Sequence, residues 1–166
     1  MSRKRFDQMN CGIAQALDAL GDWWTLLIVQ DAFLGARRFG QFQRSLGIAK
    51  NILSARLAHL VEHGIFERVD VGRDGERFEY QLTAKGEALL TVLTALREWS
   101  DKWVFGRGNE PVVVRDRRTG RRIGKLKVAD ADGVPLKRRE LRFEPGPGAS
   151  RETTRLLARG ARTSEA

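Results

Sequence analysis

Two histidines and a glutamate have the spacing of a zinc-binding motif found in some zinc enzymes. His59, Glu62 and His63 follow the pattern H-x-x-E-H, in which histidines four residues apart share one face of a helix and can hold a metal ion. Gly64 follows at once and is expected to end that helix. Ordinary helix packing also explains the apolar residues around the motif, so we expect solvated histidines, no metal site and no hydrolase.

The chain has a single cysteine, Cys11, at the expected start of its first helix. The positive end of a helix dipole favours a reactive thiolate at such a position, so a redox-sensing role is one interpretation. A small apolar residue packed near a subunit contact is the other. One cysteine cannot form an internal disulfide, which is typical of proteins in a reducing cytoplasm.

A third set of polar side chains occupies the first turns of a helix expected at 50–63. Helices that enter the DNA major groove present short polar and basic groups there, because those residues reach the base edges. The candidate contacts are Lys50, Asn51, Ser54, Ala55 and Arg56. The Asn51 amide can bond adenine at two points, whereas Arg56 is expected to point towards the DNA backbone. His59 and His63, further along this helix, are expected to be solvated or to face DNA.

Arginines flank this helix on both sides along the chain. Arg37, Arg38 and Arg44 lie near the preceding helix and suit phosphate contacts, although Arg37 and Arg38 can equally be solvated charges. Arg73 and Arg77 lie at a hairpin tip that can enter the adjacent minor groove. Nearby acidic residues weaken that attraction.

The elements that must position these groups are visible in the hydrophobic periodicity. Helices are expected at 11–20, 22–35, 39–46 and 50–63, with glycines at their ends. Two strand-like runs, at 65–71 and 77–82, flank an Asp-Gly turn signal. Two helices joined by a short glycine-containing turn and followed by a hairpin predict a winged helix-turn-helix at roughly residues 36–82.

A long helix is expected from Thr83 to about Phe105. Its apolar positions recur every three or four residues, which is typical of a helix that packs on a partner helix. The candidate dimer contacts are Leu89, Leu93, Leu96, Trp99 and Trp103. The tryptophans at 23, 24, 99 and 103 can instead form an aromatic effector pocket, although packing is their more common use.

The net charge of +9 is concentrated in the C-terminal third of the chain. Residues 1–110 hold 15 Lys and Arg against 14 Asp and Glu, whereas residues 111–166 hold 15 against 7. The basic pI of about 10.5 is therefore weak evidence about the helix at 50–63. Arginines at 117, 118, 121 and 122 can add nonspecific phosphate contacts or simply keep this region solvated. Short strands are expected at 112–114, 123–128 and 136–143, and disorder beyond residue 148.

The ordered motif residues across positions 11–100 resemble the HxlR-type winged-helix regulators. The resemblance rests on Cys11, Leu17, Leu20-Gly21, Trp24 to Ile28, Gly35, Arg37-Arg38-Phe39, Phe42, Ile48, Leu53-Ser54, Arg56-Leu57, Leu60, Gly64, Phe78-Glu79-Tyr80, Leu82-Thr83 and Gly86. Two positions depart from the family pattern. Trp23 replaces a residue that is usually charged, and Ala49 stands where the family often has a serine that caps the recognition helix.

The resemblance implies a homodimer that binds pseudo-palindromic operator DNA, with the N-terminal segment and the long last helix forming the dimer contact. It also implies that a cysteine at position 11 can sense oxidants or electrophiles. The C-terminal region resembles a zinc-ribbon-like appendage found in some members. Here its turns, at 119–120 and 130–133, have no cysteine, so no zinc site is expected.

Together these observations predict a mainly α (α+β) winged helix-turn-helix protein with a small basic β appendage. The expected divisions are a DNA-binding and dimerisation domain at 1–106, a β-rich, metal-free extension at 107–148 and a disordered tail at 149–166. The expected function is sequence-specific transcriptional regulation, more often repression, by a cytoplasmic, nucleoid-associated protein that is not an enzyme and needs no cofactor. An unknown small-molecule or oxidant effector fits this role. The alternative is a nonspecific architectural nucleic-acid-binding protein driven by the basic C-terminal region. No signal peptide or membrane span is expected.

Overall fold

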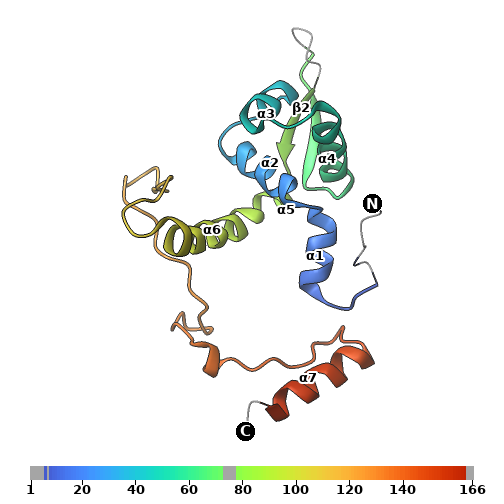
Figure 1. The fold of residues 1–166 in the computed structure, drawn as a ribbon, viewed down its shortest axis with the longest axis vertical. Coiled ribbons are helices and arrows are strands. Elements are labelled where there is room, and N and C mark those ends of the chain that lie inside the picture. The colour runs from blue at the N-terminus through green and yellow to red at the C-terminus, as the bar shows by residue number, and fades with distance from the viewer. Residues whose placement is uncertain (1–5, 7, 73–77, 164–166) are drawn as a thin grey trace. The chain divides into compact units, whose positions relative to one another are not determined.

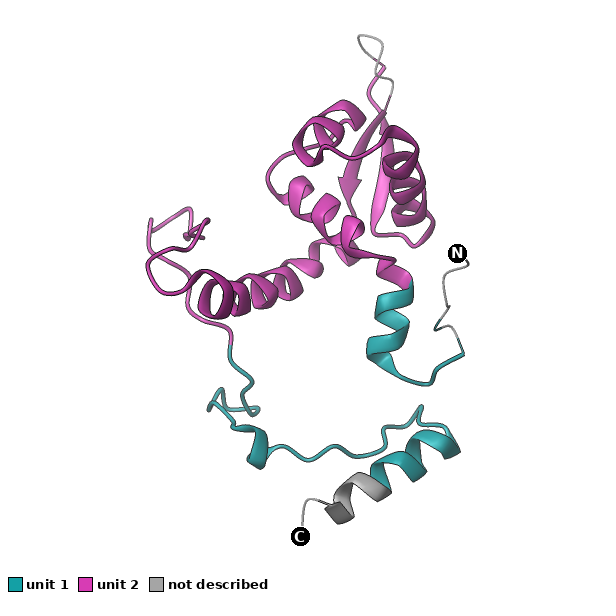
Figure 2. Cartoon of the chain, viewed as in Figure 1, with its two compact units in different colours: residues 1–18, 127–166 teal, residues 19–126 magenta. Residues whose placement is uncertain are grey.

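The computed structural model (Figure 1) describes residue 6, residues 8–72 and residues 78–163, with side chains as far as residue 158. The chain separates into two compact units, residues 19–126 and residues 1–18 with 127–166 (Figure 2). Among the described residues, none of the helices combines the length and apolar character that crossing a lipid bilayer requires.

The first four elements along the chain are helices, and their boundaries lie close to those that the sequence predicts. They are α1 (Gly12–Leu20), α2 (Trp23–Phe33), α3 (Phe39–Leu46) and α4 (Lys50–Glu62). The Asp22 carboxylate caps α2 by accepting a hydrogen bond from the Trp24 N–H at 3.1 Å. Gly47 ends α3 in the left-handed conformation, with φ of 60°, which glycine adopts without the strain of a Cβ.

A two-stranded antiparallel sheet follows α4. Strand β1 (Phe66–Asp70) pairs with β2 (Phe78–Leu82) in a register that places Phe66 opposite Leu82. The intervening residues 73–77 fall outside the described part of the chain, so the expected turn there is not described. This hairpin directly after α4 completes the winged helix-turn-helix that the sequence predicts.

The expected long helix beyond the sheet is divided into three consecutive pieces. These are α5 (Ala84–Glu87), α6 (Leu89–Ser100) and the π-helical segment η1 (Asp101–Phe105). The Thr83 hydroxyl caps the start, accepting from the Gly86 N–H at 3.2 Å. Gly86 is buried against Ile65, just before β1, and against Leu82 of β2: a Cβ there would collide with the carbonyl oxygen of Ile65 and lie 2.8 Å from Leu82 Cδ2.

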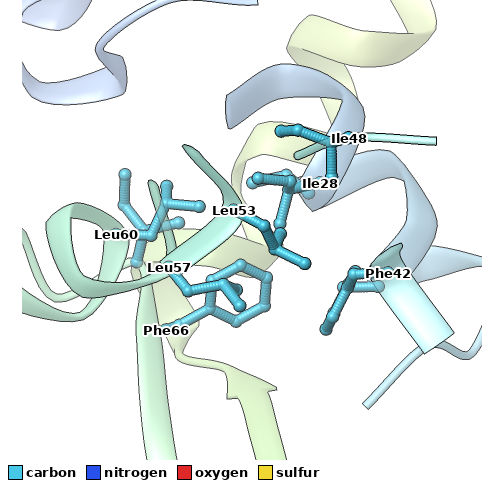
Figure 3. Close-up of a cluster of buried hydrophobic side chains, with 10 residues drawn as sticks. Ile28, Phe42, Ile48, Leu53, Leu57, Leu60 and Phe66 are labelled. Carbon is cyan, nitrogen blue, oxygen red and sulfur yellow. The ribbon is translucent and has the colours of Figure 1, made fainter. Parts of the chain in front are cut away.

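The core of this unit lies between α2, α3, α4 and the sheet (Figure 3). Its buried side chains are Ile28, Val29, Ala32, Phe42, Ile48, Leu53, Leu57, Leu60, Ile65 and Phe66. The rings of Phe42 and Phe66 meet edge to face with centroids 6.2 Å apart. Burying each large apolar side chain contributes about 1.5–3 kcal/mol, so this cluster fixes the orientation of α4.

Beyond residue 106 the expected strands do not form. The described residues there contain two isolated antiparallel bridges, Arg115 with Arg122 and Ala129 with Pro135, and a short 3-10 helix, η2 (Arg138–Glu140). Hydrogen bonds from the Arg118 side chain hold the pKa of Asp116 below its usual value. The apolar runs are mostly exposed, and with little buried surface to organise them they form turns rather than a sheet.

The C-terminal region contains a helix, α7 (Arg151–Thr163), where the sequence predicts disorder. The Ser150 hydroxyl accepts from the Thr153 N–H at 3.1 Å, a helix start that resembles an N-cap. Asn10 joins this region to the N-terminal segment of the same unit, since its amide donates to the Gly148 carbonyl and its oxygen accepts from the Ser150 N–H. A local cap and polar bonds therefore order residues that carry few large apolar groups.

Candidate nucleic-acid interface

Helices α3 and α4 form a helix-turn-helix pair joined by residues 47–49. Within this turn the Ile48 side chain is 4% exposed and belongs to the core. The turn is therefore anchored between the two helices, with Gly47 providing the backbone reversal. This anchoring sets the position of α4 relative to α3.

The first turns of α4 present the polar side chains that the sequence singles out. Lys50, Asn51, Ser54 and Ala55 are all exposed. Leu53, Leu57 and Leu60 occupy the opposite face and are completely buried (Figure 3). An open depression of about 540 Å³ is lined by Lys50, Asn51 and Ser54 together with Phe39 of α3. Polar groups on a rigid, well-packed helix can make directional hydrogen bonds to a partner surface.

The N-terminus of α4 has no side-chain cap. Ala49 occupies the N-cap position with extended backbone geometry but has no side-chain oxygen to accept a hydrogen bond. N–H groups at the start of a helix carry partial positive charge and attract anions. This end of α4 can therefore accept a phosphate beside the exposed Lys50.

Arg56 lies on a different part of α4 from the exposed polar residues. Its side chain is 28% exposed, and one terminal nitrogen lies 2.6 Å from Asp22 Oδ2. Asp22 also caps α2. This ion pair gives Arg56 a structural role between α4 and α2, and its expected contact with the DNA backbone stays a prediction.

The arginines before α3 are held by neighbouring groups. Gln41 accepts hydrogen bonds from the backbone N–H groups of Arg37 and Arg38 at 2.7 and 2.8 Å. Arg38 Nε donates to Glu79 of β2 at 3.1 Å, and its side chain remains 38% exposed. Gln41 was not among the predicted site residues, although a glutamine three residues into a helix is a recognisable capping signal.

The remaining predicted phosphate contacts differ in how well they are described. Arg44 is exposed on α3, and its Nε donates to the Gly40 carbonyl at 3.2 Å. Arg73 and Arg77 lie outside the described residues, so their expected minor-groove contacts stay predictions. Of the described arginines predicted to contact DNA, Arg44 is exposed, whereas Arg37, Arg38 and Arg56 are half-buried.

The two histidines are neither fully solvated nor close to the exposed start of α4. Both are half-buried, His59 in the last turn of α4 and His63 directly after the helix. His59 Nε2 lies 2.9 Å from the Ala19 carbonyl oxygen, and His63 Nδ1 lies 3.0 Å from the His59 carbonyl oxygen. His59 therefore has a structural contact at the junction of α1 and α2, which the sequence did not predict. For His63 the expectation of a solvated or DNA-facing ring stays a prediction.

Cys11 is exposed and immediately precedes α1. Its thiol is therefore outside the apolar core of the single chain. The structure leaves both predicted roles open, since an exposed thiol can react or can pack against a second subunit.

The predicted dimer contacts fall into two groups that differ in exposure. Leu89 and Leu93 are half-buried and pack against the core of their own chain. Leu96, Trp99 and Trp103 are 49%, 61% and 65% exposed. Other large apolar side chains, which the sequence did not place in the dimer contact, are also exposed on α2, α6 and η1: Trp23, Leu27, Leu90, Val92, Val104 and Phe105.

A cavity of about 460 Å³ opens between α2 and α6. It is lined mainly by apolar groups, including Trp23, Leu27, Leu96 and Phe105, with Arg97 and Asp101 among its polar residues. Of the four tryptophans in the predicted aromatic set, Trp23 lines this cavity. The arrangement is consistent with an apolar contact surface or with a pocket.

Comparisons with known proteins agree with this architecture. A family model described as HxlR-like helix-turn-helix matches residues 19–107. Rv3095, an HTH-type transcriptional regulator of Mycobacterium tuberculosis (strain ATCC 25618 / H37Rv), is 39% identical over 136 residues, which cover 82% of this chain and 86% of the relative.

Solved structures resemble the chain over different lengths. The crystal structure of PA1607, described as a candidate transcription factor, matches with a TM-score of 0.79 at 43% identity. The match covers 86% of this chain and 100% of that one. The redox regulator HypR in its reduced form has a TM-score of 0.50 at 26% identity and covers 54% of this chain and 90% of its own. The chain therefore belongs to the HxlR-like helix-turn-helix family.

Proposed function

We propose that this protein is a sequence-specific, DNA-binding transcriptional regulator, acting as a repressor that binds a pseudo-palindromic operator as a homodimer. The observation that carries the proposal is the contrast between the two faces of α4. Lys50, Asn51 and Ser54 are exposed at its first turns, whereas the opposite face is fixed in the core. Membership of a family whose members are named transcriptional regulators supports this role over that of an enzyme.

In this proposal α4 enters the major groove with its N-terminal end foremost. The Asn51 amide bonds the N6 and N7 edge of adenine, and Lys50 reaches guanine or a phosphate. Ser54 and Ala55, one turn later, contact the neighbouring base pair. Arg44 and the partly exposed Arg38 hold the DNA backbone, with Arg37, Arg56, Arg73 and Arg77 as further candidates for phosphate or minor-groove contacts.

The homodimer is proposed to form through the exposed apolar side chains of α6 and η1. Leu96, Trp99 and Trp103 present a large apolar area to solvent in the single chain, which is typical of an interaction surface. Leu89 and Leu93, which belong to the same predicted dimer contact, connect the exposed apolar surface of α6 and η1 to the core. A two-fold dimer would place two α4 helices in successive major grooves, about 34–36 Å apart.

Regulation by an oxidant through Cys11 is a further part of the proposal. The exposed thiol and the likeness to a structure described as a redox regulator support it. A structural role at the dimer contact is the alternative. Operator binding measured with and without hydrogen peroxide or a quinone separates the two, because an unchanged affinity would exclude the sensing role.

For residues beyond 106 we propose a small basic appendage, metal-free and related to a zinc-ribbon-like piece that has lost its cysteines. The turn at 130–133 supports a knuckle-like geometry: Asp130 Oδ1 accepts from the Asp132 and Val134 N–H groups at 3.0 and 2.8 Å. Residues 1–106 then form the DNA-binding and dimerisation domain, and the protein acts at the nucleoid in the cytoplasm.

The second candidate function is nonspecific architectural binding of nucleic acid. The excess of 15 basic over 7 acidic residues in 111–166 favours it. Selection of bound genomic fragments followed by footprinting distinguishes the two functions. A regulator protects a two-fold symmetric site and prefers it by about 10³-fold or more over random DNA. An architectural protein protects no defined site, and deletion of residues 111–166 abolishes its binding.

A further inference from the structure

The last turn of α4 and the residue that follows it bring together three metal-ligating side chains that the proposed DNA contacts do not use. One ligand atom from each of His59, Glu62 and His63 lies within 4.8 Å of the other two. The imidazole rings of the two histidines are 4.0 Å apart. These are the only two histidines in the chain.

The hydrogen bonds of the two rings determine which nitrogens can act as ligands. His59 Nε2 lies 2.9 Å from the Ala19 carbonyl oxygen, and His63 Nδ1 lies 3.0 Å from the His59 carbonyl oxygen. A carbonyl oxygen can only accept, so each of these nitrogens carries the proton. The lone pairs are then on His59 Nδ1 and His63 Nε2. Donation of one ring N–H to a backbone carbonyl is the usual way in which a protein orients a metal-binding histidine.

The surroundings hold His59 in place, the His63 ring is oriented by its bond to the His59 carbonyl oxygen, and Glu62 is the most adjustable of the three. A Cβ added at Gly21 would lie 3.3 Å from both Cδ2 and Nε2 of the His59 ring, so this ring packs closely on the backbone between α1 and α2. Glu62 is exposed and His63 is half-buried. Ligand atoms on a tetrahedral ion with bonds of about 2.0–2.1 Å lie roughly 3.3 Å apart. Rotation of the exposed Glu62 side chain, with a small shift of the His63 ring that keeps its bond to the His59 carbonyl oxygen, can supply the required contraction.

The charges in this region are compatible with a bound cation. Glu62 contributes a carboxylate, and the histidines bind metals as neutral rings. The ammonium group of Lys85 donates to the His63 carbonyl oxygen at 2.7 Å, so its hydrogen bond is made to the backbone and not to the imidazole.

In place of the sequence-based expectation of no metal site, we propose that His59, Glu62 and His63 form a binding site for one divalent transition-metal ion of the zinc, nickel and copper class. Imidazole nitrogens with a carboxylate oxygen suit these ions, whereas magnesium prefers oxygen ligands. A water molecule completes the coordination. The ion links the end of α4 to the α1–α2 junction through the His59 bond to Ala19, and it leaves the polar start of α4 unobstructed.

The test is calorimetric titration of the tag-free, full-length protein with zinc chloride, nickel chloride and, as a negative probe, magnesium chloride. We expect one zinc ion per chain, no magnesium binding, and zinc-dependent shifts of both histidine ring signals in NMR spectra. His63→Ala and Glu62→Gln each weaken zinc binding at least about tenfold, the equivalent of 1.4 kcal/mol. Glu67→Gln, which neutralises an exposed carboxylate on β1, leaves the affinity unchanged.

His59→Ala also removes the hydrogen bond to Ala19, so its effect on folding is separated by thermal unfolding without metal. A variant that keeps the wild-type melting temperature but loses binding supports the site. The proposal is overturned if zinc fails to bind the wild-type chain, or if binding persists unchanged in His63→Ala. Equal weakening in Glu67→Gln would also overturn it, because surface charge and not coordination would then explain the effect.

Discussion

Replacing Ala49 with serine should stabilise the protein by supplying the cap that α4 lacks. Ala49 has the extended N-cap conformation, with φ of −61° and ψ of 138°, and it makes no side-chain cap bond. A serine hydroxyl at this position accepts a hydrogen bond from the backbone N–H of Asn51 or Ile52. The Ala49 side chain is exposed, so the added oxygen displaces no packed neighbour.

The expected gain follows from the cost of removing such caps elsewhere. An N-cap hydroxyl contributes about 1 kcal/mol relative to alanine. For a domain of this size, 1 kcal/mol raises the melting temperature by roughly 4 °C. Urea unfolding followed by the fluorescence of the four tryptophans should show a higher midpoint with an unchanged slope, because the surface exposed on unfolding is the same.

Ala55→Ser is the matched control. It makes the same chemical change at another exposed position of the same helix, where no uncapped N–H group is available. Serine is a poorer helix former than alanine, so this variant should lose about 0.5 kcal/mol. The reasoning is refuted if Ala49→Ser and Ala55→Ser shift the midpoint in the same direction by similar amounts.

The remaining predictions concern DNA binding, a shared carboxylate and assembly. Asn51→Ala should weaken operator binding by about 1–3 kcal/mol per half-site in fluorescence anisotropy while leaving random-DNA affinity nearly unchanged, and an equal loss on both DNAs would contradict base reading. Asp22→Ala should destabilise the fold by about 1–2 kcal/mol because the α2 cap and the Arg56 ion pair are both lost. Asp22→Ser should recover most of that loss in thermal unfolding, and failure to do so would assign the effect to the ion pair. Trp103→Ser should raise the dimer dissociation constant at least about tenfold in analytical ultracentrifugation, with little change in monomer unfolding since the side chain is 65% exposed, and an unaltered dimer would place the interface elsewhere.

The helices around the candidate nucleic-acid interface were predictable because the residues that start and end them act locally. Asp22 before α2, the glycine after α3 and Thr83 before α5 each act within a few residues of the boundary that they define. The exposure of Lys50 and Asn51 was predictable for a similar reason. Leucines at 53, 57 and 60 share one helical face, so the polar residues between them must turn outward.

Contacts between distant parts of the chain were less accessible to sequence reasoning. Arg56 follows Lys50, Asn51 and Ser54 along α4, so the sequence predicts that it contacts DNA. Its ion-pair partner in the structure, Asp22, lies 34 positions earlier in the chain. His59 likewise meets Ala19, 40 positions away. Local periodicity places a residue on a helix face and does not identify the element that covers that face.

The basic C-terminal region shows a different limit. Runs of β-branched residues such as Val112 to Val114 have strand propensity, but a strand also needs a partner and an apolar surface to cover. The valines at 112 and 113 are 50% and 39% exposed, and this part of the chain forms bridges rather than strands. The α7 helix has the opposite character, since its local cap and the polar contacts of Asn10 order a segment that carries little apolar area.

The tight packing at Gly86 has a consequence for genetics. Alanine is normally a mild replacement in a helix, but here its methyl group would meet the Ile65 carbonyl and force α5 away from the end of the sheet. Gly86 belongs neither to the exposed face of α4 nor to the apolar face of α6. Loss-of-function alleles should therefore accumulate at this position in an unbiased screen, and they would act by reducing the amount of folded regulator rather than by altering the DNA that it recognises.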